Sequence, residues 1–178
     1  MRNLVTTVVA FMAVACGGTA GDPTADTMQQ RASAQSSAPA KEDVCGEPFK
    51  GPSWGTTTST VEFPLVHNLF TGPAIVSGLG RSQVVFPHDW NLIDKSVTGF
   101  MTITAANGDE LFARVTGSAM FRPDGLIADL DQFGSFEGGT GRFVGAEGSF
   151  SIIGTITRAT GAVVVDMDGY LVRNRKCD

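Results

Sequence analysis

Two histidines are the first side chains of this sequence that could take part in catalysis. His67 stands in "VHNL", and His88 stands in "PHDW" beside Asp89. A histidine next to a carboxylate can work as a general acid or base. The segment from Phe86 to Asp94 is rich in turn-forming residues, however, and we expect a loop that leaves the His88 imidazole in solvent. Neither histidine stands at a spacing typical of metal ligands, so the sequence predicts no metal site and no cofactor.

Two pairs of aspartates could also do chemistry: Asp129 and Asp131 in "DLD", and Asp166 and Asp168 in "DMDG". Side chains alternate along a strand, so both members of a pair lie on one face. Such a pair can hold a calcium ion or act as acid and base. Around the second pair, Val163, Val165 and Met167 share the opposite face of the strand and make it apolar. We therefore interpret both pairs as the solvent side of amphipathic strands.

The stretch "FEGGTGRFVGAEGSF", residues 136–150, raises the alternative of a phosphate-binding loop. A Walker loop needs a lysine after its last glycine, whereas Thr140 follows Gly139 here. A dinucleotide loop needs a third glycine where Val144 stands. We therefore predict that Gly138 to Gly141 form a hairpin turn, that the phenylalanines beyond it pack inside the domain, and that the stretch binds no nucleotide.

The N-terminus has the features of an export signal: Arg2, the apolar run "LVTTVVAFMAV", and small residues before Cys16. Two cleavage sites overlap. "AVA" fits a signal peptidase site, and "AVAC" resembles a bacterial lipobox, in which the cysteine carries lipid. We favour lipid attachment at Cys16, because it removes the odd one of three cysteines. The prediction is an exported protein anchored to a membrane of the cell envelope, or else secreted.

The remaining cysteines, Cys45 and Cys177, flank the part of the chain that carries strand patterns. In an oxidising compartment we expect a disulfide between them, and two free thiols are the alternative. The segment between Gly17 and Val44 has almost no large apolar residues and is interpreted as a disordered tether. The predicted organisation is a signal peptide (1–15), a flexible tether (16–44) and one folded domain (45–178). The net charge of −5 and the lack of a strong basic cluster argue against nucleic acid as a partner.

Alternation of β-branched and aromatic residues with polar ones predicts an all-β domain. About eight short strands occur, with turn signals such as Asn107-Gly108 between them. We expect them between residues 58 and 172, in the runs "TSTVEF", "AIVSGL", "SQVVF", "VTGFMTIT", "ELFARVTGSAMF", "LIADLDQF", "GSFSIIGTIT" and "AVVVDMDGYLV". The predicted fold is a single eight-stranded antiparallel β-barrel, with a sandwich as the alternative. The interior of a barrel of this size is either filled by side chains or holds one small ligand.

The glycine-rich stretch resembles the "GG[ST]G.F..A.G" signature of the allene oxide cyclase-like and dirigent-like barrels. "GFMTITAANGDELFARVTGSA", residues 99–119, resembles the strand-turn-strand unit of bacterial exported members. The resemblance implies an eight-stranded antiparallel barrel, often a trimer, with an apolar cavity. Plant members cyclise an unsaturated epoxide or direct the radical coupling of phenols there. Between Ala146 and Gly148 those families carry Tyr or Arg, whereas this chain has Glu147.

Glu147 is therefore the candidate cavity residue, where burial would make its carboxyl a usable acid or base. The alternatives are an ion pair with Arg142 or a place at the barrel rim. Two functions follow from the sequence. One is a tethered barrel that binds a small apolar ligand or has a structural or interaction role at the cell surface. The other is a cofactor-free isomerase or cyclase.

Overall fold

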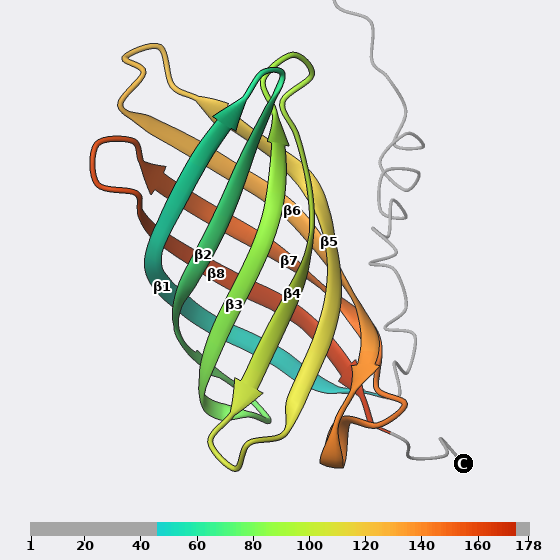
Figure 1. The fold of residues 1–178 in the computed structure, drawn as a ribbon. Coiled ribbons are helices and arrows are strands. Elements are labelled where there is room, and N and C mark those ends of the chain that lie inside the picture. Colours follow the sequence, from blue (N-terminus) through green and yellow to red (C-terminus); the bar gives the residue numbers. More distant parts are fainter. Residues whose placement is uncertain (1–45, 174–178) are drawn as a thin grey trace, which may run out of the picture. The chain divides into compact units, whose positions relative to one another are not determined.

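The computed structural model describes residues 46–173, which form a closed barrel of eight strands. Each strand pairs antiparallel with the next, and the last pairs with the first, as Figure 1 shows. The strands are β1 (Glu47–Glu62), β2 (Leu65–Val76), β3 (Gly80–Asn91), β4 (Ser96–Ala105), β5 (Glu110–Phe121), β6 (Ile127–Gly139), β7 (Glu147–Thr157) and β8 (Ala162–Val172). The predicted fold is confirmed. No helix within the described residues has the length and apolar character needed to cross a membrane.

Strict alternation of side chains builds the wall of the barrel. In β8, Val163, Val165 and Met167 are buried inside, whereas Asp166 and Asp168 are exposed outside. Asp129 and Asp131 are likewise exposed on β6. A strand whose side chains alternate in this way has one apolar face and one polar face. The interpretation of both aspartate pairs as solvent-facing is confirmed.

The barrel has two different ends. The hairpins β1–β2, β3–β4, β5–β6 and β7–β8 lie at one end, which is uppermost in Figure 1. The hairpins β2–β3, β4–β5 and β6–β7 lie at the other end, together with the first residues of β1 and the last of β8. We call these the upper and the lower end, and the two parts of the interior next to them the upper and the lower half.

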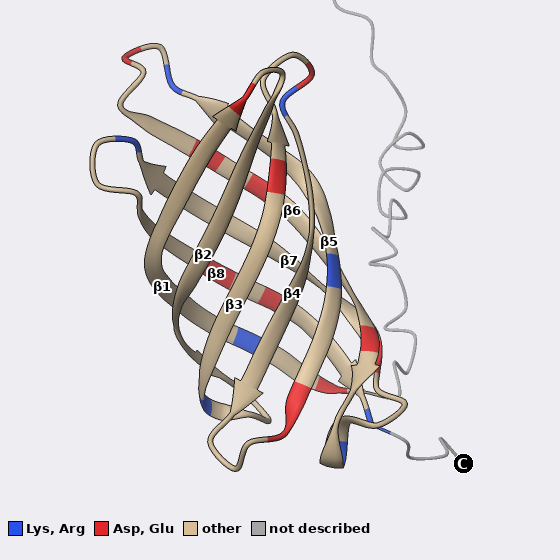
Figure 2. Ribbon diagram, viewed as in Figure 1, with Lys and Arg blue, Asp and Glu red and all other residues tan. Residues whose placement is uncertain are grey.

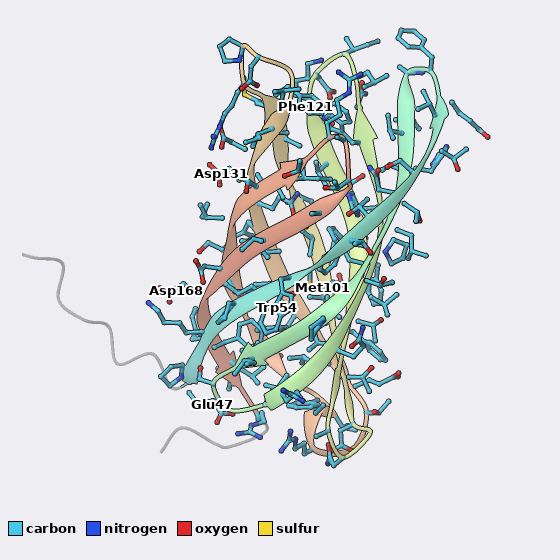
Figure 3. All side chains as sticks on the ribbon, turned by 90° about the vertical axis from the view of Figure 1, so that its left-hand side faces the viewer. Glu47, Trp54, Met101, Phe121, Asp131 and Asp168 are labelled. Atoms are coloured by element: carbon cyan, nitrogen blue, oxygen red, sulfur yellow. The ribbon has the colours of Figure 1, made fainter. Side chains whose placement is uncertain are left out.

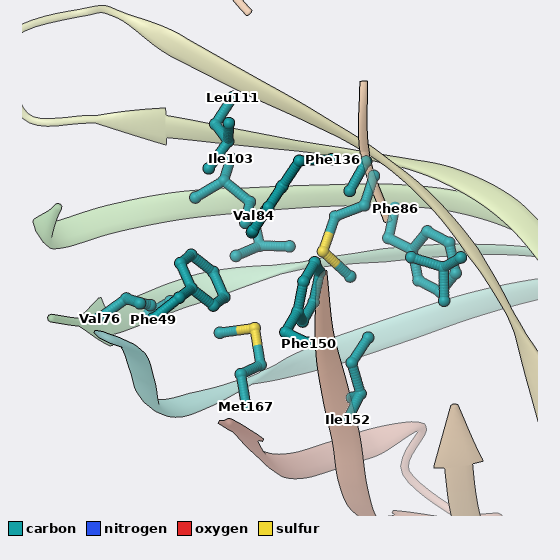
Figure 4. Packing of buried hydrophobic residues seen from close by; sticks show 14 of the residues in the cluster. Phe49, Val76, Val84, Phe86, Ile103, Leu111, Phe136, Phe150, Ile152 and Met167 are labelled. Atoms are coloured by element: carbon teal, nitrogen blue, oxygen red, sulfur yellow. The ribbon is translucent and has the colours of Figure 1, made fainter. Parts of the chain in front are cut away.

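Aromatic side chains fill the lower half. The rings of Phe49, Phe136 and Phe150 have their centroids 4.8 to 4.9 Å apart, and Figure 4 shows them packed with the surrounding aliphatic residues. Gly134 makes room for them, because a Cβ atom there would lie 2.3 Å from the ring of Phe150. Such aromatic contacts add about 0.5 to 1.5 kcal/mol per pair to the free energy of burial. The lower half is therefore a packed core.

The connection from β6 to β7 closes the lower end, and it differs from the hairpin turn expected at Gly138 to Gly141. The strand β6 continues through Gly139, and a short 3-10 helix follows at Gly141–Phe143. Phe143 is fully buried, as is Phe150, which confirms that the phenylalanines of this stretch pack inside. The turn lies later than predicted because Gly139 still belongs to the ladder, where it pairs with Leu111.

Two strands are longer than the sequence suggests. Pro48, Gly51, Pro52 and Gly55 argue against a strand before residue 56, yet β1 begins at Glu47. These residues are accommodated because β1 coils closely against its neighbour: a Cβ atom at Gly55 would lie 2.2 Å from a carbonyl oxygen of β2. The second of these strands is β3, and the expectation of a loop from residue 86 to residue 94 is wrong. The strand β3 continues to Asn91 and pairs there with β2.

Candidate functional site

The upper half of the barrel interior is a cavity of about 810 Å³. In Figure 3, Phe121 lies near its upper end and Met101 lies about halfway down the barrel, whereas Glu47 lies at the lower end. Met101 and Met167 belong to its floor, above the aromatic core. The aromatic residues of its wall are Phe70, Phe86, Trp90 and Phe121. The volume is within the range of about 300 to 1,000 Å³ that is typical of small-molecule sites.

Polar side chains form a stripe across the cavity wall on β1, β2 and β3. Ser59 pairs with Asn68 in the β1–β2 ladder, and Asn68 pairs with His88 in the β2–β3 ladder. All three line the cavity. The Ser59 hydroxyl donates to the Asn68 side-chain oxygen at 2.6 Å, and the Asn68 amide donates to the Val66 carbonyl at 3.2 Å. The stripe offers fixed hydrogen-bonding groups on an otherwise apolar wall.

His88 is the titratable group of this stripe. Its Nδ1 lies 3.0 Å from the Phe86 carbonyl oxygen. A carbonyl can only accept, so Nδ1 carries the proton and Nε2 has a free lone pair. The ring stacks on Phe86 with centroids 4.3 Å apart. Burial lowers the pKa of His88 below its ordinary 6.5, which favours the neutral imidazole. The cavity therefore contains a neutral base and hydrogen-bond acceptor.

Two further polar groups of the cavity wall have no partner among residues 46–173. The indole Nε1 of Trp90 is buried without a hydrogen bond, although its ring packs edge-on against Phe121 at 5.6 Å. Gln132 is only 6% exposed on the wall formed by β6, and no hydrogen bond of its amide is found in that part of the chain. Buried donors and acceptors are normally satisfied. These groups are thus available to a bound molecule.

The acid–base pair that His88 and Asp89 could have formed does not exist. The two residues are neighbours on β3, so their side chains point to opposite faces of the wall. Asp89 lies outside, where its carboxylate is 2.6 Å from Nδ1 of His67. That hydrogen bond raises the pKa of His67 above 6.5. The expectation of a solvated His88 is also wrong, because residue 88 belongs to a strand whose inner face lines the cavity.

Glu147 lies away from the cavity. It is the first residue of β7 at the lower end, pairs with Val172 and is exposed. Ala146 and Phe150 point inward, so alternation turns Glu147 outward. Its suggested partner Arg142 interacts with Asp109 instead, at 3.8 Å. Within residues 46–173 no group of three or more His, Cys, Asp or Glu side chains could hold a metal ion. Cys16, Cys45 and Cys177 lie outside the described residues.

The glycine-rich stretch takes no part in the cavity. No residue between 136 and 150 belongs to the cavity lining as described. Three residues of the cavity wall come instead from "VVFPHDW" on β3. These alternate residues, Phe86, His88 and Trp90, all point inward. The signal that could have revealed them is this period of two, which the proline and the two polar residues obscure.

Comparison with known proteins supports the fold. No family model matches this sequence, and no curated protein matches it. The solved structure of the pterocarpan synthase dirigent protein PsPTS1 is 12% identical with a TM-score of 0.53, over 72% of this chain and 96% of that one. The structure of the pterocarpan synthase dirigent protein GePTS1 is 15% identical with a TM-score of 0.50, over 74% and 91%. The chain therefore shares the barrel fold of dirigent proteins.

Proposed function

We propose that the domain binds one small, largely apolar molecule in the upper half of its barrel. The observation that carries this proposal is the cavity of about 810 Å³, whose apolar wall bears a few fixed polar groups. A barrel with a purely structural role has no need of that volume, because inward side chains of the size found in the lower half would fill it. The unpartnered groups of Trp90 and Gln132 and the free Nε2 of His88 give such a molecule its orientation.

Trp90 provides a direct test, because it lines the cavity. The chain has two tryptophans, and Trp54 is exposed on the outer face of β1. In a Trp54→Phe variant of the full chain, Trp90 is the sole indole reporter. We expect 1-decanol to change its fluorescence saturably. Ala128 is buried in the cavity wall, so an added Ala128→Phe substitution should abolish the change while the circular dichroism spectrum stays that of a barrel. Equal binding by both proteins would contradict the proposal.

A cofactor-free isomerase or cyclase is the second candidate, and His88 favours it. A neutral imidazole with a free Nε2 in an apolar cavity can remove a proton from a bound substrate. The two solved structures reported above, to which the fold is similar, are of pterocarpan synthase dirigent proteins. The test compares the wild type with His88→Gln, which keeps a hydrogen-bonding side chain, for pterocarpan formation and for epoxide cyclisation. We expect turnover that depends on His88, and absence of turnover by the wild type in both assays would contradict this candidate.

We further propose that the protein is exported and anchored by lipid at Cys16, on the basis of "AVAC" in its sequence. Such an anchor would keep the ligand-binding domain at a membrane surface of the cell envelope. Mass spectrometry of the native N-terminus tests the proposal. The expected product begins with a lipid-modified cysteine, whereas an unmodified Cys16 or a cut elsewhere would contradict it.

A further inference from the structure

The cations of the described residues are distributed unevenly between paired and unpaired positions. Five of them make salt bridges: Lys50 with Asp168, Arg114 with Glu137, Arg122 with Asp129, Arg142 with Asp109, and Arg173 with Glu47. Within residues 46–173, Arg81, Lys95 and Arg158 make none. Lys95 and Arg158 both line the upper cavity, whereas Arg81 belongs to the lower end of β3. Unpaired positive charge is thus concentrated at the mouth of the cavity.

Lys95 has an unusual backbone conformation that places it there. It is the one non-glycine residue with positive φ, +66°, in the described part of the chain. Such a conformation is uncommon for a residue with a side chain. The β3–β4 hairpin holds it in place: its N–H donates to the Asn91 carbonyl at 2.9 Å, and its Nζ donates to the Leu92 carbonyl. The ammonium lies 5.8 Å from the centre of the Trp90 ring. Two of the three N–H groups of the ammonium remain available for hydrogen bonds to a ligand.

Arg158 approaches the mouth from the β7–β8 hairpin. Its backbone N–H donates to the Leu126 carbonyl at 2.9 Å, which ties this hairpin to the β5–β6 hairpin. Its guanidinium lies 5.4 Å from the centre of the Phe121 ring. Both cations therefore stand over aromatic residues of the cavity mouth, where cation–π contact keeps them near the opening.

No acid balances these two cations in the cavity itself. The lining as described contains no Asp or Glu, although the chain has a net charge of −5. Figure 2 shows both signs of charge at the upper hairpins. Asp94 attracts Lys95 electrostatically, but within residues 46–173 neither Lys95 nor Arg158 forms a salt bridge, and the acids of these hairpins have other contacts. Glu62 approaches His67 at 3.6 Å, Asp94 accepts from the Ser96 N–H and hydroxyl, and Asp124 accepts from the Leu126 N–H.

From this arrangement we propose that the ligand is amphipathic, with an apolar body in the cavity and one anionic headgroup at Lys95 and Arg158. The inference rests on the proposed binding function and specifies its ligand class. A carboxylate or sulfonate at the mouth stays partly hydrated, so its desolvation is small. It gains charge-assisted hydrogen bonds from the ammonium and the guanidinium. A cationic headgroup at the same place would be repelled.

The test compares three ligands that share one alkyl chain and differ in the headgroup: decanoate, 1-decanol and decyltrimethylammonium. Each is titrated into the full chain carrying Trp54→Phe, with decanoate and decyltrimethylammonium below their micellar concentrations and 1-decanol below its solubility limit. We expect decanoate to bind about tenfold more tightly than 1-decanol at low salt, since two partly exposed ion pairs supply about 1.4 kcal/mol together. Decyltrimethylammonium should bind most weakly. The advantage of decanoate should shrink at about 0.5 M salt, because screening acts on exposed charges.

Single substitutions then locate the headgroup. Lys95→Gln and Arg158→Gln should each weaken decanoate binding about threefold and change 1-decanol binding by less than that. Arg81→Gln is the matched control, because Arg81 is also unpaired but lies at the opposite end, and it should change neither ligand. If 1-decanol binds as tightly as decanoate, or if Arg81→Gln acts like the other two variants, the headgroup proposal is wrong while ligand binding stands. If no ligand binds, the proposed function itself fails.

Discussion

The lower and the upper half of the barrel interior are built by the same eight strands but have opposite contents. In the lower half Phe49, Phe136 and Phe150 meet at 4.8 to 4.9 Å, and the β6–β7 connection adds the fully buried Phe143. In the upper half the inner faces mix aromatic rings with short and polar side chains and enclose about 810 Å³. The comparison teaches that this barrel separates a packed core from an open cavity along its axis.

The strand β1 shows how the interior changes from a packed core to an open cavity. The inward residues of β1 begin with Phe49 in the lower half, pass through the buried Ser53, and continue as Thr57 and Ser59 in the wall of the cavity. Ser53 donates to the Pro73 carbonyl at 3.1 Å and so satisfies its hydroxyl at the boundary. Above this level the inward side chains of β1 are too short to reach across the barrel. The volume of the cavity follows from their size.

The largest effect is expected from truncation of the aromatic core. Phe150→Ala should reduce the free energy of unfolding by about 3 to 5 kcal/mol, because it leaves a cavity among rings that are already packed. Phe121→Ala is the matched variant in the upper half. The ring of Phe121 already borders the open cavity, so its removal should reduce the free energy of unfolding by about 1 kcal/mol or less. Urea denaturation measures both. Equal losses would show that the two halves do not differ in packing.

The closure of the lower end should be the next most sensitive feature. Gly141 has φ +52°, and a Cβ atom there would lie 1.9 Å from a carboxylate oxygen of Asp109. Gly141→Val combines backbone strain with this clash and should destabilise the protein by about 2 to 3 kcal/mol. Gly108→Val is the control, because Gly108 has φ +89° but no atom within 4 Å of the added Cβ. Gly108→Val should therefore destabilise the protein less than Gly141→Val. Equal melting temperatures of Gly141→Val and the wild type would refute this account of the connection.

Removal of a polar group from the upper half should affect stability least. Gln132 is 6% exposed and lines the cavity, and no hydrogen bond of its amide is found within residues 46–173, so Gln132→Met should leave the free energy of unfolding unchanged or raise it by up to about 1 kcal/mol. Binding of 1-decanol should remain, since the cavity keeps its volume. A loss above about 1 kcal/mol in urea denaturation would mean that the Gln132 amide stabilises the fold.

The two histidines sharpen the contrast between inside and outside. Burial lowers the pKa of His88 below 6.5, and the hydrogen bond with Asp89 raises that of His67 above 6.5. Stability linked to His88 is therefore present above pH 6.5 and is lost as the pH falls through its folded pKa. Stability linked to His67 is present below pH 6.5 and is lost as the pH rises through its folded pKa. An NMR titration of the imidazole protons should give two values on opposite sides of 6.5. The reverse order would contradict both assignments.

Much of the fold could be predicted from the sequence, because alternation of residue types is a local property. The sequence Asp166, Met167, Asp168 alternates polar and apolar residues, and this alternation shows which side chains of β8 face solvent. Asn107-Gly108 lies in the β4–β5 turn as expected, with Gly108 at φ +89°. The strand β1 was harder to recognise, since its prolines and glycines are tolerated only through close pairing with β2 and β8.

The site depends on properties that are not local. The cavity exists because short inward residues of several strands share one level of the barrel, and the register between strands sets that level. Asp89 follows His88 in the chain, but strand geometry places their side chains on opposite sides of the wall. The resemblance around Glu147 pointed to a residue of the lower end. For these reasons the candidate site could not be read from sequence neighbours alone.

A methyl NMR titration of the full chain with 1-decanol tests most directly whether the upper half is the binding site. The account predicts saturable shifts for Met101, Ile152 and Ile156, which line the cavity. It predicts no shifts for Ile103 and Leu111, which are fully buried in the packed core. Shifts confined to exposed methyl groups such as those of Ile75 and Ile153, or no shift at any methyl group, would contradict the claim that the barrel interior binds a ligand.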